Sequence, residues 1–405
     1  MMYIFLIIYK FVFYHFYLIK KNDIISTHKN LFVKDFIMKK HHFKIGSLIS
    51  LIVILSILAV KLFIPTVVPI ETTKKQNLDL SLTQNDFYID EANYADSMQQ
   101  IVVPYLSQYE HSDYFTTSDN TKIYYKQYLL EQPKGHIAIS HGFTESSQKY
   151  DEVIYYFLME GYNVSILEHR GHGYSDRMVD DPSKVHIEDF NTYVEDFKAF
   201  MDTVVIPTIT NEPCYLYAHS MGGGIGARFL ETSPEYFDAA VLSAPMLEIE
   251  TGGIPIPLAK FISKAATLTG FGKSYVLGHG PFEETYSFEN ASTSSEPRYK
   301  YIYNKKINDP MIRTNGATFN WLSASLKGSE LASENSDKVN IPVLLFQSGQ
   351  DTLVKPNGQN TFVNNAPQAT LIYVADAKHE LYCEVQEIMV PYFNTIFNFF
   401  NAFHA

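Results

Sequence analysis

One stretch of sequence decides how the rest of the chain is interpreted: Cys214-Tyr215-Leu216-Tyr217-Ala218-His219-Ser220-Met221-Gly222-Gly223-Gly224. Its apolar part, Cys214–Ala218, has the length and composition of a buried strand, and the glycines that follow open a helical segment. Ser220 lies at the turn between them, with the small residues Ala218 and Gly222 two positions before and after it. Small residues at these positions let the helix cross close to the strand and leave the serine hydroxyl exposed, which is typical of a nucleophile elbow.

A serine at such a turn needs a base, and the base needs an orienting carboxylate, because a serine hydroxyl at its ordinary pKa is a poor nucleophile. The expected order along the chain is serine, acid, histidine. The strand-like segment 343–346 runs on to Asp351, and the strand-like segment 370–374 runs on to His379. Since functional sites of open α/β sheets form at the carboxyl ends of the strands, Ser220, Asp351 and His379 are predicted to form a catalytic triad.

Two backbone N–H groups are predicted to stabilise the oxyanion that forms when such a serine attacks an acyl carbonyl. Met221 directly follows the serine, and Phe143 lies in the loop after the strand-like segment 136–140, where the second donor is expected. Asp376 is an alternative orienting acid, but it lies only three residues before His379. A residue so close in sequence rarely reaches the correct ring nitrogen, so the acid after the earlier strand is preferred.

Short apolar runs alternate with amphipathic segments through most of the chain after residue 100. This alternation predicts an α/β fold with a mostly parallel central sheet flanked by helices, because strands buried on both faces are continuously apolar. Residues 76–246 and 336–405 are predicted to form the two parts of one hydrolase core. Between them, residues 247–335 are rich in Gly, Ser, Thr and Tyr and lack the alternation, which predicts a helical cap inserted into the core.

An uncharged run, Ile45–Val60, with lysines on its N-terminal side, predicts a membrane anchor and linker within residues 38–75. No small-residue cleavage site follows it, so the anchor is predicted to stay attached. Residues 1–37 hold a second apolar run, which is either another span or an extension ahead of a true start at Met38; the extension is preferred. The flanking lysines favour a single-pass protein of the cell membrane with its body outside the cytoplasm, although two lysines just past the run weaken this orientation.

The composition excludes several classes of protein. Apolar residues make up 46% and charged residues 19% of the 405 positions, which is typical of a globular chain. Lysines are concentrated in the first 44 residues, so the rest of the chain is more acidic than the net charge of −12 indicates, and nucleic acid is not expected as a partner. Cys214 and Cys383 are predicted not to pair. No metal-ligand or phosphate-loop motif occurs, so no cofactor is expected.

These motifs resemble the α/β-hydrolase fold, and within it the bacterial lysophospholipases and monoacylglycerol lipases that are often labelled with serine aminopeptidases. From about residue 124 onward, the matching stretches outside the insertion are His141-Gly142-Phe143-Thr144-Glu145-Ser146, Glu168-His169-Arg170-Gly171-His172-Gly173-Tyr174-Ser175, Ala218-His219-Ser220-Met221-Gly222-Gly223 and Leu242-Ser243-Ala244-Pro245-Met246. Those inside it, which resemble inner-membrane lysophospholipases in particular, are Asp309-Pro310, Arg313 and Phe319-Asn320-Trp321. The resemblance implies the triad Ser220, Asp351 and His379 and the oxyanion donors Phe143 and Met221. These are the same residues that the strand ends and the spacing predict.

The resemblance implies a serine esterase that releases the fatty acid from single-chain lipids, lysophospholipids above all, through an acyl-enzyme. The apolar and aromatic residues of the insertion are then expected to shelter one acyl chain. A monoacylglycerol lipase is one alternative. A serine aminopeptidase is another, in which Glu283, Glu284 and Glu289 would be available to hold a peptide amine. A binding protein on the same scaffold is a third, but a complete triad argues against it, since a pure binder needs no base.

Overall fold

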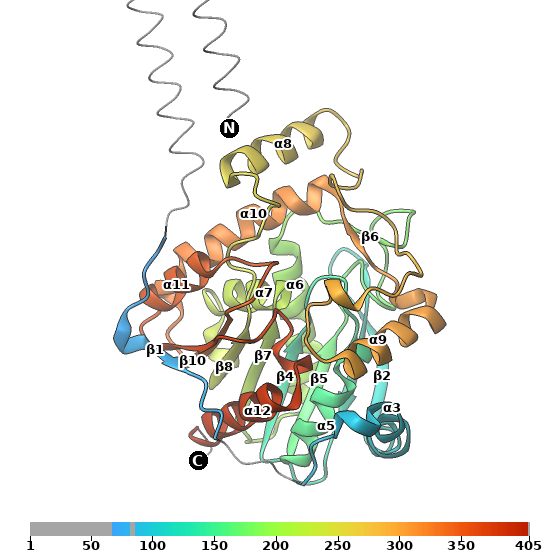
Figure 1. The fold of residues 1–405 in the computed structure, drawn as a ribbon, viewed down its shortest axis with the longest axis vertical. Helices are drawn as coiled ribbons and strands as arrows, with labels where there is room; N and C mark the ends of the chain where they lie inside the picture. Colours follow the sequence, from blue (N-terminus) through green and yellow to red (C-terminus); the bar gives the residue numbers. More distant parts are fainter. Residues whose placement is uncertain (1–66, 82–85, 404–405) are drawn as a thin grey trace, which may run out of the picture. The chain divides into compact units, whose positions relative to one another are not determined.

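The computed structural model describes residues 67–81 and 86–403 (Figure 1). The predicted membrane run and the whole of the N-terminal extension lie outside the described residues. In the described part of the chain, no helix combines the length and the apolar character that a bilayer crossing needs.

A nine-stranded sheet, counted over the described residues, forms the centre of the fold. Its order is β1-β11-β10-β8-β7-β4-β5-β3-β2. The strands are β1 (Lys75–Asn77), β2 (Glu110–Thr116), β3 (Lys122–Tyr128), β4 (Gly135–Ser140), β5 (Tyr162–Leu167), β7 (Cys214–His219), β8 (Ala239–Ser243), β10 (Val343–Ser348) and β11 (Ala369–Val374). Only the β2–β3 and β3–β5 pairs are antiparallel, and all other neighbours are parallel. The predicted, mostly parallel sheet is therefore confirmed.

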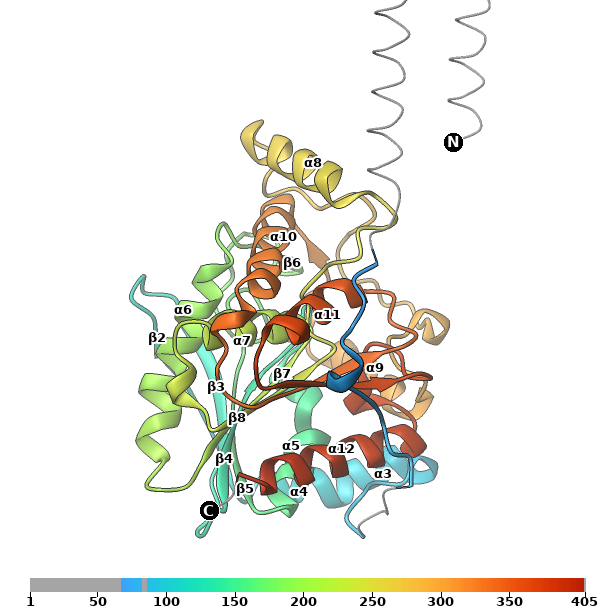
Figure 2. The same ribbon diagram turned by 90° about the vertical axis from the view of Figure 1, so that its left-hand side faces the viewer.

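Helices cover both faces of the sheet, and each face has its own apolar core (Figure 2). One face carries α3 (Tyr94–Ser97), α4 (Val103–Leu106), α5 (Asp151–Met159) and α12 (Gln386–Asn401), and the other carries α6 (Asn191–Phe200), α7 (Met221–Leu230), α10 (Phe319–Glu334) and α11 (Pro356–Asn365). Strand β7 shows how the side chains of one strand are distributed between the two cores. Tyr215 and Tyr217 pack into the first core, and Leu216 and Ala218 into the second, because successive side chains of a strand point to opposite faces.

The insertion after β8 is mainly helical. It contains α8 (Ile256–Leu268) and α9 (Glu296–Asn308), and a short strand, β9 (Gly316–Ala317), that pairs with β6 (Lys184–Val185) of the core. The last helix of the predicted insertion, α10, packs against α7, α8 and α11. It therefore extends the helical layer of the core, whereas α8 and α9 lie further out (Figure 1).

A buried arginine fixes α9 to the core. Arg298 is fully buried, and its guanidinium contacts Glu152 of α5 at 2.8 Å and Glu91 of the N-terminal segment at 3.1 Å. It also donates to the backbone carbonyls of Ile89 and Glu384. These contacts join the inserted helix to three other segments of the core.

Replacing Arg298 with methionine is expected to lower the free energy of unfolding by about 3–5 kcal/mol, because the substitution leaves Glu152 buried without its cation. Urea denaturation followed by circular dichroism measures this change. Lys300→Met on the exposed face of the same helix is the matched control and should unfold at the wild-type urea concentration. Equal stability of the two variants would contradict the prediction.

Candidate active site

The turn around Ser220 has the strained geometry that its sequence predicts. Ser220 has φ 52° and ψ −116°, lies directly before α7 and is 8% exposed. A non-glycine residue with positive φ is uncommon and is found where a fold holds a side chain in place for function. A Cβ atom at Gly222 would overlap the carbonyl oxygens of Ser140 and His141, so α7 can approach the end of β4 only because this position is glycine.

Gly222→Ala is expected to lower the free energy of unfolding by about 3 kcal/mol or more, because the added methyl group meets rigid backbone rather than a side chain that can move. Thermal unfolding of the purified variant measures the loss. Gly252→Ala is the control for added bulk, because a Cβ atom there meets no other atom and only its positive φ adds strain. A wild-type melting temperature for Gly222→Ala would show that the helix can shift at no cost.

The three predicted triad side chains form one hydrogen-bonded chain. Ser220 Oγ lies 2.8 Å from His379 Nε2, and His379 Nδ1 lies 2.6 Å from Asp351 Oδ2. The other carboxylate oxygen of Asp351 accepts the backbone N–H groups of Leu353 and Val354 at 2.8 and 3.0 Å. Burial would raise the pKa of Asp351, but these N–H groups and the histidine lower it below its usual value, which keeps the carboxylate ionised.

The alternative acid, Asp376, is not brought to the histidine. Its side chain is exposed, whereas His379 is 3% exposed and bonded to Asp351. Glu380, the next acidic residue along the chain, contacts Lys149 at 2.7 Å instead. The geometry therefore agrees with the assignment that spacing and strand ends predict.

The predicted oxyanion donors flank the serine. Met221 begins α7, and Phe143 lies in the loop after β4. Neither backbone N–H has a hydrogen-bond partner within the described part of the chain, so both remain available to a substrate oxygen. His141 braces this loop, because its ring contacts the carbonyl oxygen of Gly142 at 2.8 Å and accepts the backbone N–H of His169 at 3.0 Å.

Glu145 has a role that its sequence context does not reveal. Its buried carboxylate accepts the backbone N–H of Gly142 at 2.6 Å, the hydroxyls of Tyr150 and Tyr382 at 2.6 Å each, and the Lys149 ammonium at 2.8 Å. Burial would raise the pKa of Glu145, but Lys149 and the hydroxyl donors hold it well below its usual range. A fixed carboxylate at this point orients the loop that carries the Phe143 N–H.

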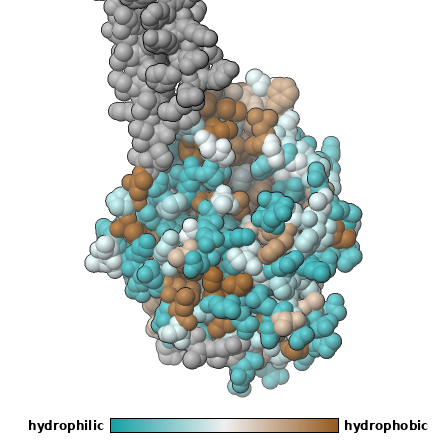
Figure 3. Space-filling model, viewed as in Figure 1, coloured by the Kyte–Doolittle hydropathy of each residue, from teal (hydrophilic) through white to brown (hydrophobic). Residues whose placement is uncertain are grey.

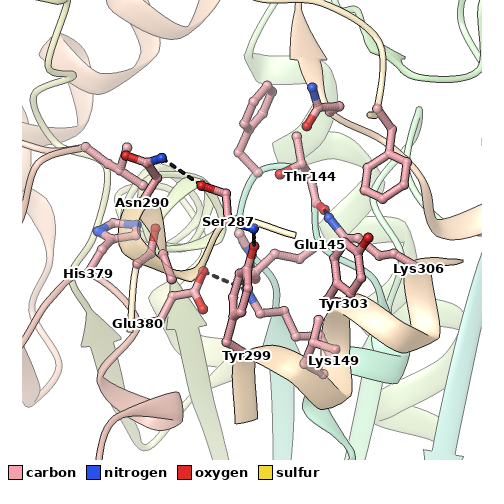
Figure 4. Close-up of a pocket in the computed structure, with 18 of the residues that line it drawn as sticks. Thr144, Glu145, Lys149, Ser287, Asn290, Tyr299, Tyr303, Lys306, His379 and Glu380 are labelled. Atoms are coloured by element: carbon pink, nitrogen blue, oxygen red, sulfur yellow. Dashed lines mark hydrogen bonds and ion pairs between the residues drawn. The ribbon is translucent and has the colours of Figure 1, made fainter. Parts of the chain in front are cut away.

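A cavity of about 800 Å³ opens at Ser220 and His379 (Figure 4). The core contributes the oxyanion loop, Ser220, His379 and the segment that follows His379. The insertion contributes several residues between 278 and 292, about two turns of α9 and Asn315. Helix α8 does not line this cavity, and several of its apolar side chains are exposed: Leu258, Phe261 and Leu268. This differs from the expectation that the apolar residues of the insertion as a whole shelter an acyl chain.

The remaining histidines near the site pack inside the loops. His169 and His172 are buried, and burial lowers the pKa of each well below the usual value, so both are neutral. His219 contacts the carbonyl oxygen of Ser243, and its ring packs against that of His379 at the wall of the cavity. Cys214 and Cys383 are free and buried, which confirms the prediction that they do not pair.

Comparison with known proteins assigns the family. The family model described as serine aminopeptidase, S33, matches residues 131–386, which is more than half of the chain. The chain belongs to this family. It is a serine hydrolase, and the resemblance inferred from its motifs is confirmed.

Curated relatives are named as lipid-ester hydrolases. The chain is 29% identical over 303 residues to lysophospholipase L2 of Escherichia coli, covering 72% of this chain and 87% of the relative. It is 26% identical over 306 residues to a probable lysophospholipase L2 of Haemophilus influenzae, covering 74% and 95%. Human monoglyceride lipase is 26% identical over 268 residues, covering 65% and 81%.

Solved structures establish the fold. A thermostable carboxyl esterase from Bacillus coagulans superposes with a TM-score of 0.62 at 19% identity, covering 73% of this chain and 99% of that one. A soluble variant of monoglyceride lipase from Saccharomyces cerevisiae gives a TM-score of 0.58 at 17% identity, covering 73% and 96%. The S33 protein therefore has the α/β-hydrolase fold, and it acts on lipid esters as a class.

Proposed function

We propose that this S33 protein releases the fatty acid from single-chain lipids, lysophospholipids above all, by a Ser-His-Asp acyl-enzyme mechanism. The observation that carries the proposal is the hydrogen-bonded chain Ser220–His379–Asp351, which opens into a cavity shared by core and insertion. The lysophospholipase L2 relatives, which align over most of their own length, support the choice of substrate.

The geometry supports each step of the proposed reaction. Ser220 Oγ attacks the acyl carbonyl carbon while His379 Nε2 takes the hydroxyl proton, and the backbone N–H groups of Phe143 and Met221 bind the oxyanion. His379 then protonates the glycerol oxygen as the ester C–O bond breaks, leaving an acyl-enzyme. Water attacks this ester, gives its proton to His379 and releases the fatty acid, and the histidine returns a proton to Ser220. Asp351 holds the imidazole in one tautomer throughout.

The proposal includes an N-terminal membrane anchor within residues 38–75, with the catalytic body outside the cytoplasm. Support comes from the uncharged run with lysines before it. A second support is the exposed apolar side chains of α8, where hydrophobic residues gather at the end of the molecule that carries this helix (Figure 3). Exposed apolar patches of this kind are typical of surfaces that contact membranes or other proteins. An enzyme held at a bilayer would meet amphiphilic substrates directly.

The charged residues of the insertion support the aminopeptidase alternative less than they support a lipid-ester hydrolase. It needs a free carboxylate at the cavity to bind a peptide amine. Glu284 is paired with Arg313 at 2.8 Å, and Glu289 is exposed and does not line the cavity. Glu283 lines the cavity but is itself exposed, where a single charge binds weakly.

Fatty-acid release by the detergent-solubilised full chain tests the proposed function. The substrates are lysophosphatidylcholine, lysophosphatidylethanolamine, monoacylglycerol and an aminoacyl-naphthylamide, with the Ser220→Ala variant as the blank. Release from the two lysophospholipids that exceeds release from monoacylglycerol supports the proposal. Preference for monoacylglycerol identifies a monoacylglycerol lipase, and cleavage of the amide alone identifies a peptidase; either result rejects the proposal.

A further inference from the structure

Helix α9 presents one face to the cavity. Tyr299, Ile302, Tyr303 and Lys306 all line it, at positions i, i+3, i+4 and i+7 of the helix (Figure 4). An adjacent face holds the helix to the core through Arg298 and through Lys305, which contacts Asp151. The cavity-facing side is therefore positioned by contacts on the face beside it. Among the four residues that line the cavity, Lys306 carries the single charge.

The two lysines that line the cavity differ in their partners. Lys149 lies between Glu145 at 2.8 Å and Glu380 at 2.7 Å, so its charge is already compensated. Lys306 donates one hydrogen bond, to the carbonyl oxygen of Thr144 at 3.1 Å, and no carboxylate among residues 67–81 and 86–403 lies within ion-pairing distance of it. An ammonium group has three donors, so Lys306 keeps two donors and an uncompensated positive charge at the cavity wall.

The position of Lys306 places this charge beside the reacting ester. Thr144, whose carbonyl it contacts, is the residue directly after Phe143, the predicted oxyanion donor. A substrate carbonyl bound there would have its leaving alcohol in the same cavity. In a lysophospholipid the phosphate is attached one glycerol unit away from the ester, whereas in a monoacylglycerol the same position carries a neutral hydroxyl group.

We propose that Lys306 is a specificity-determining residue that binds the head-group phosphate of a lysophospholipid and so favours phosphorylated single-chain lipids over neutral monoacylglycerols. The inference rests on the proposed function and names the head-group chemistry that this site selects. A charge-assisted hydrogen bond from the Lys306 ammonium to a phosphate is stronger than a neutral hydrogen bond. A substrate without a phosphate would leave this ammonium buried and unpaired, which weakens its binding. The same charge repels a peptide amine, which also separates this site from that of an aminopeptidase.

The surroundings of Lys306 make the effect depend on pH. Burial and the nearby Lys149 charge lower the pKa of Lys306 to about 8, while Glu145 and Glu380 oppose the shift. The ammonium is therefore present below pH 8 and lost above it. Phosphate binding should weaken as the pH rises through about 8, and the pH profile of kcat/KM, which reports the free enzyme, should show this only for a phosphorylated substrate.

The test compares kcat/KM of the detergent-solubilised full chain on lysophosphatidylcholine and on monoacylglycerol with the same acyl chain. Lys306→Met is expected to lower kcat/KM on the lysophospholipid by about ten- to a hundredfold and to leave it nearly unchanged on monoacylglycerol. Lys306→Arg, which keeps the charge, should retain the preference and move its loss to higher pH. Lys300→Met, on the exposed face of α9, is the matched control. An equal loss on both substrates, or no loss on either, overturns the proposal, because Lys306 would then only brace the Thr144 carbonyl or do nothing.

A binding measurement keeps this inference separate from the proposed function. Calorimetric titration of the Ser220→Ala variant with sn-glycero-3-phosphocholine needs no turnover, so it gives an answer even if no lipid is hydrolysed. Binding that Lys306→Met abolishes supports head-group recognition. Inorganic phosphate is the second ligand: if it binds through Lys306 while glycerophosphocholine does not, the site takes free phosphate and the proposal falls. Absence of binding by both ligands also overturns it.

Discussion

Replacing Ser220 with alanine is expected to lower kcat for fatty-acid release from lysophosphatidylcholine by about a millionfold. The variant keeps the base, the orienting acid and both oxyanion donors but has no oxygen that can form the acyl-enzyme. Its hydroxyl contacts His379 alone within the triad, so the fold around it should survive the change. A stopped assay with radiolabelled lipid measures the residual rate.

A fluorophosphonate probe supplies the control for this prediction. The probe should label the wild type on Ser220, as located by mass spectrometry of the digested protein, and should not label the alanine variant. Ser112→Ala, on the exposed edge strand β2, should label and turn over like the wild type. Labelling of a different serine, or an alanine variant that keeps more than a thousandth of the rate, would contradict the assigned nucleophile.

The meeting of Ser220, Asp351 and His379 was predictable because each residue follows an apolar run with the length and composition of a buried strand. Ser220 follows β7, Asp351 lies just past β10, and His379 lies just past β11. These strands are parallel and close together in the sheet, so their carboxyl ends lie at one edge. A strong local pattern and a simple rule of topology were therefore enough to bring together residues that are far apart in the sequence.

The charged residues around the cavity were not predictable in the same way. Lys149 meets Glu380 and Lys306 meets the Thr144 carbonyl across long sequence separations, and neither pair is marked by any local motif. Their meeting depends on where α9 packs, which in turn depends on the buried contact of Arg298 with Glu152. Periodicity can indicate which face of a helix is apolar, but it cannot indicate which buried charge that helix will meet.

Two parts of the fold were missed for a related reason. Strand β2 has six exposed residues of seven, so it lacks the apolar run that reveals the inner strands. The segment 91–106 lies in or near a polar stretch of the sequence, yet Tyr94, Met98, Val102 and Leu106 are buried against the core. Edge strands and short peripheral helices are specified mainly by tertiary packing, which local patterns represent poorly.

Asp351→Asn is expected to lower kcat by about ten-thousandfold while leaving the fold intact. In the wild type the carboxylate can only accept, so His379 Nδ1 must donate and Nε2 is free to take the serine proton. Asp351 Oδ1 accepts the N–H groups of Leu353 and Val354, so the oxygen of an asparagine amide would stay there and its NH₂ group would face the ring. The histidine would then carry its proton on Nε2, where it cannot accept one from Ser220.

Asp376→Asn is the matched control, because it makes the same chemical change at the alternative acid of the same loop region, where the side chain is exposed. It should keep the wild-type kcat, and the melting temperatures of both variants should stay close to that of the wild type. Proton NMR of the histidine ring would report the tautomer directly. A large loss of kcat in Asp376→Asn together with an active Asp351→Asn would assign the orienting role to Asp376. Wild-type kcat in both variants would mean that His379 needs no carboxylate to act as the base.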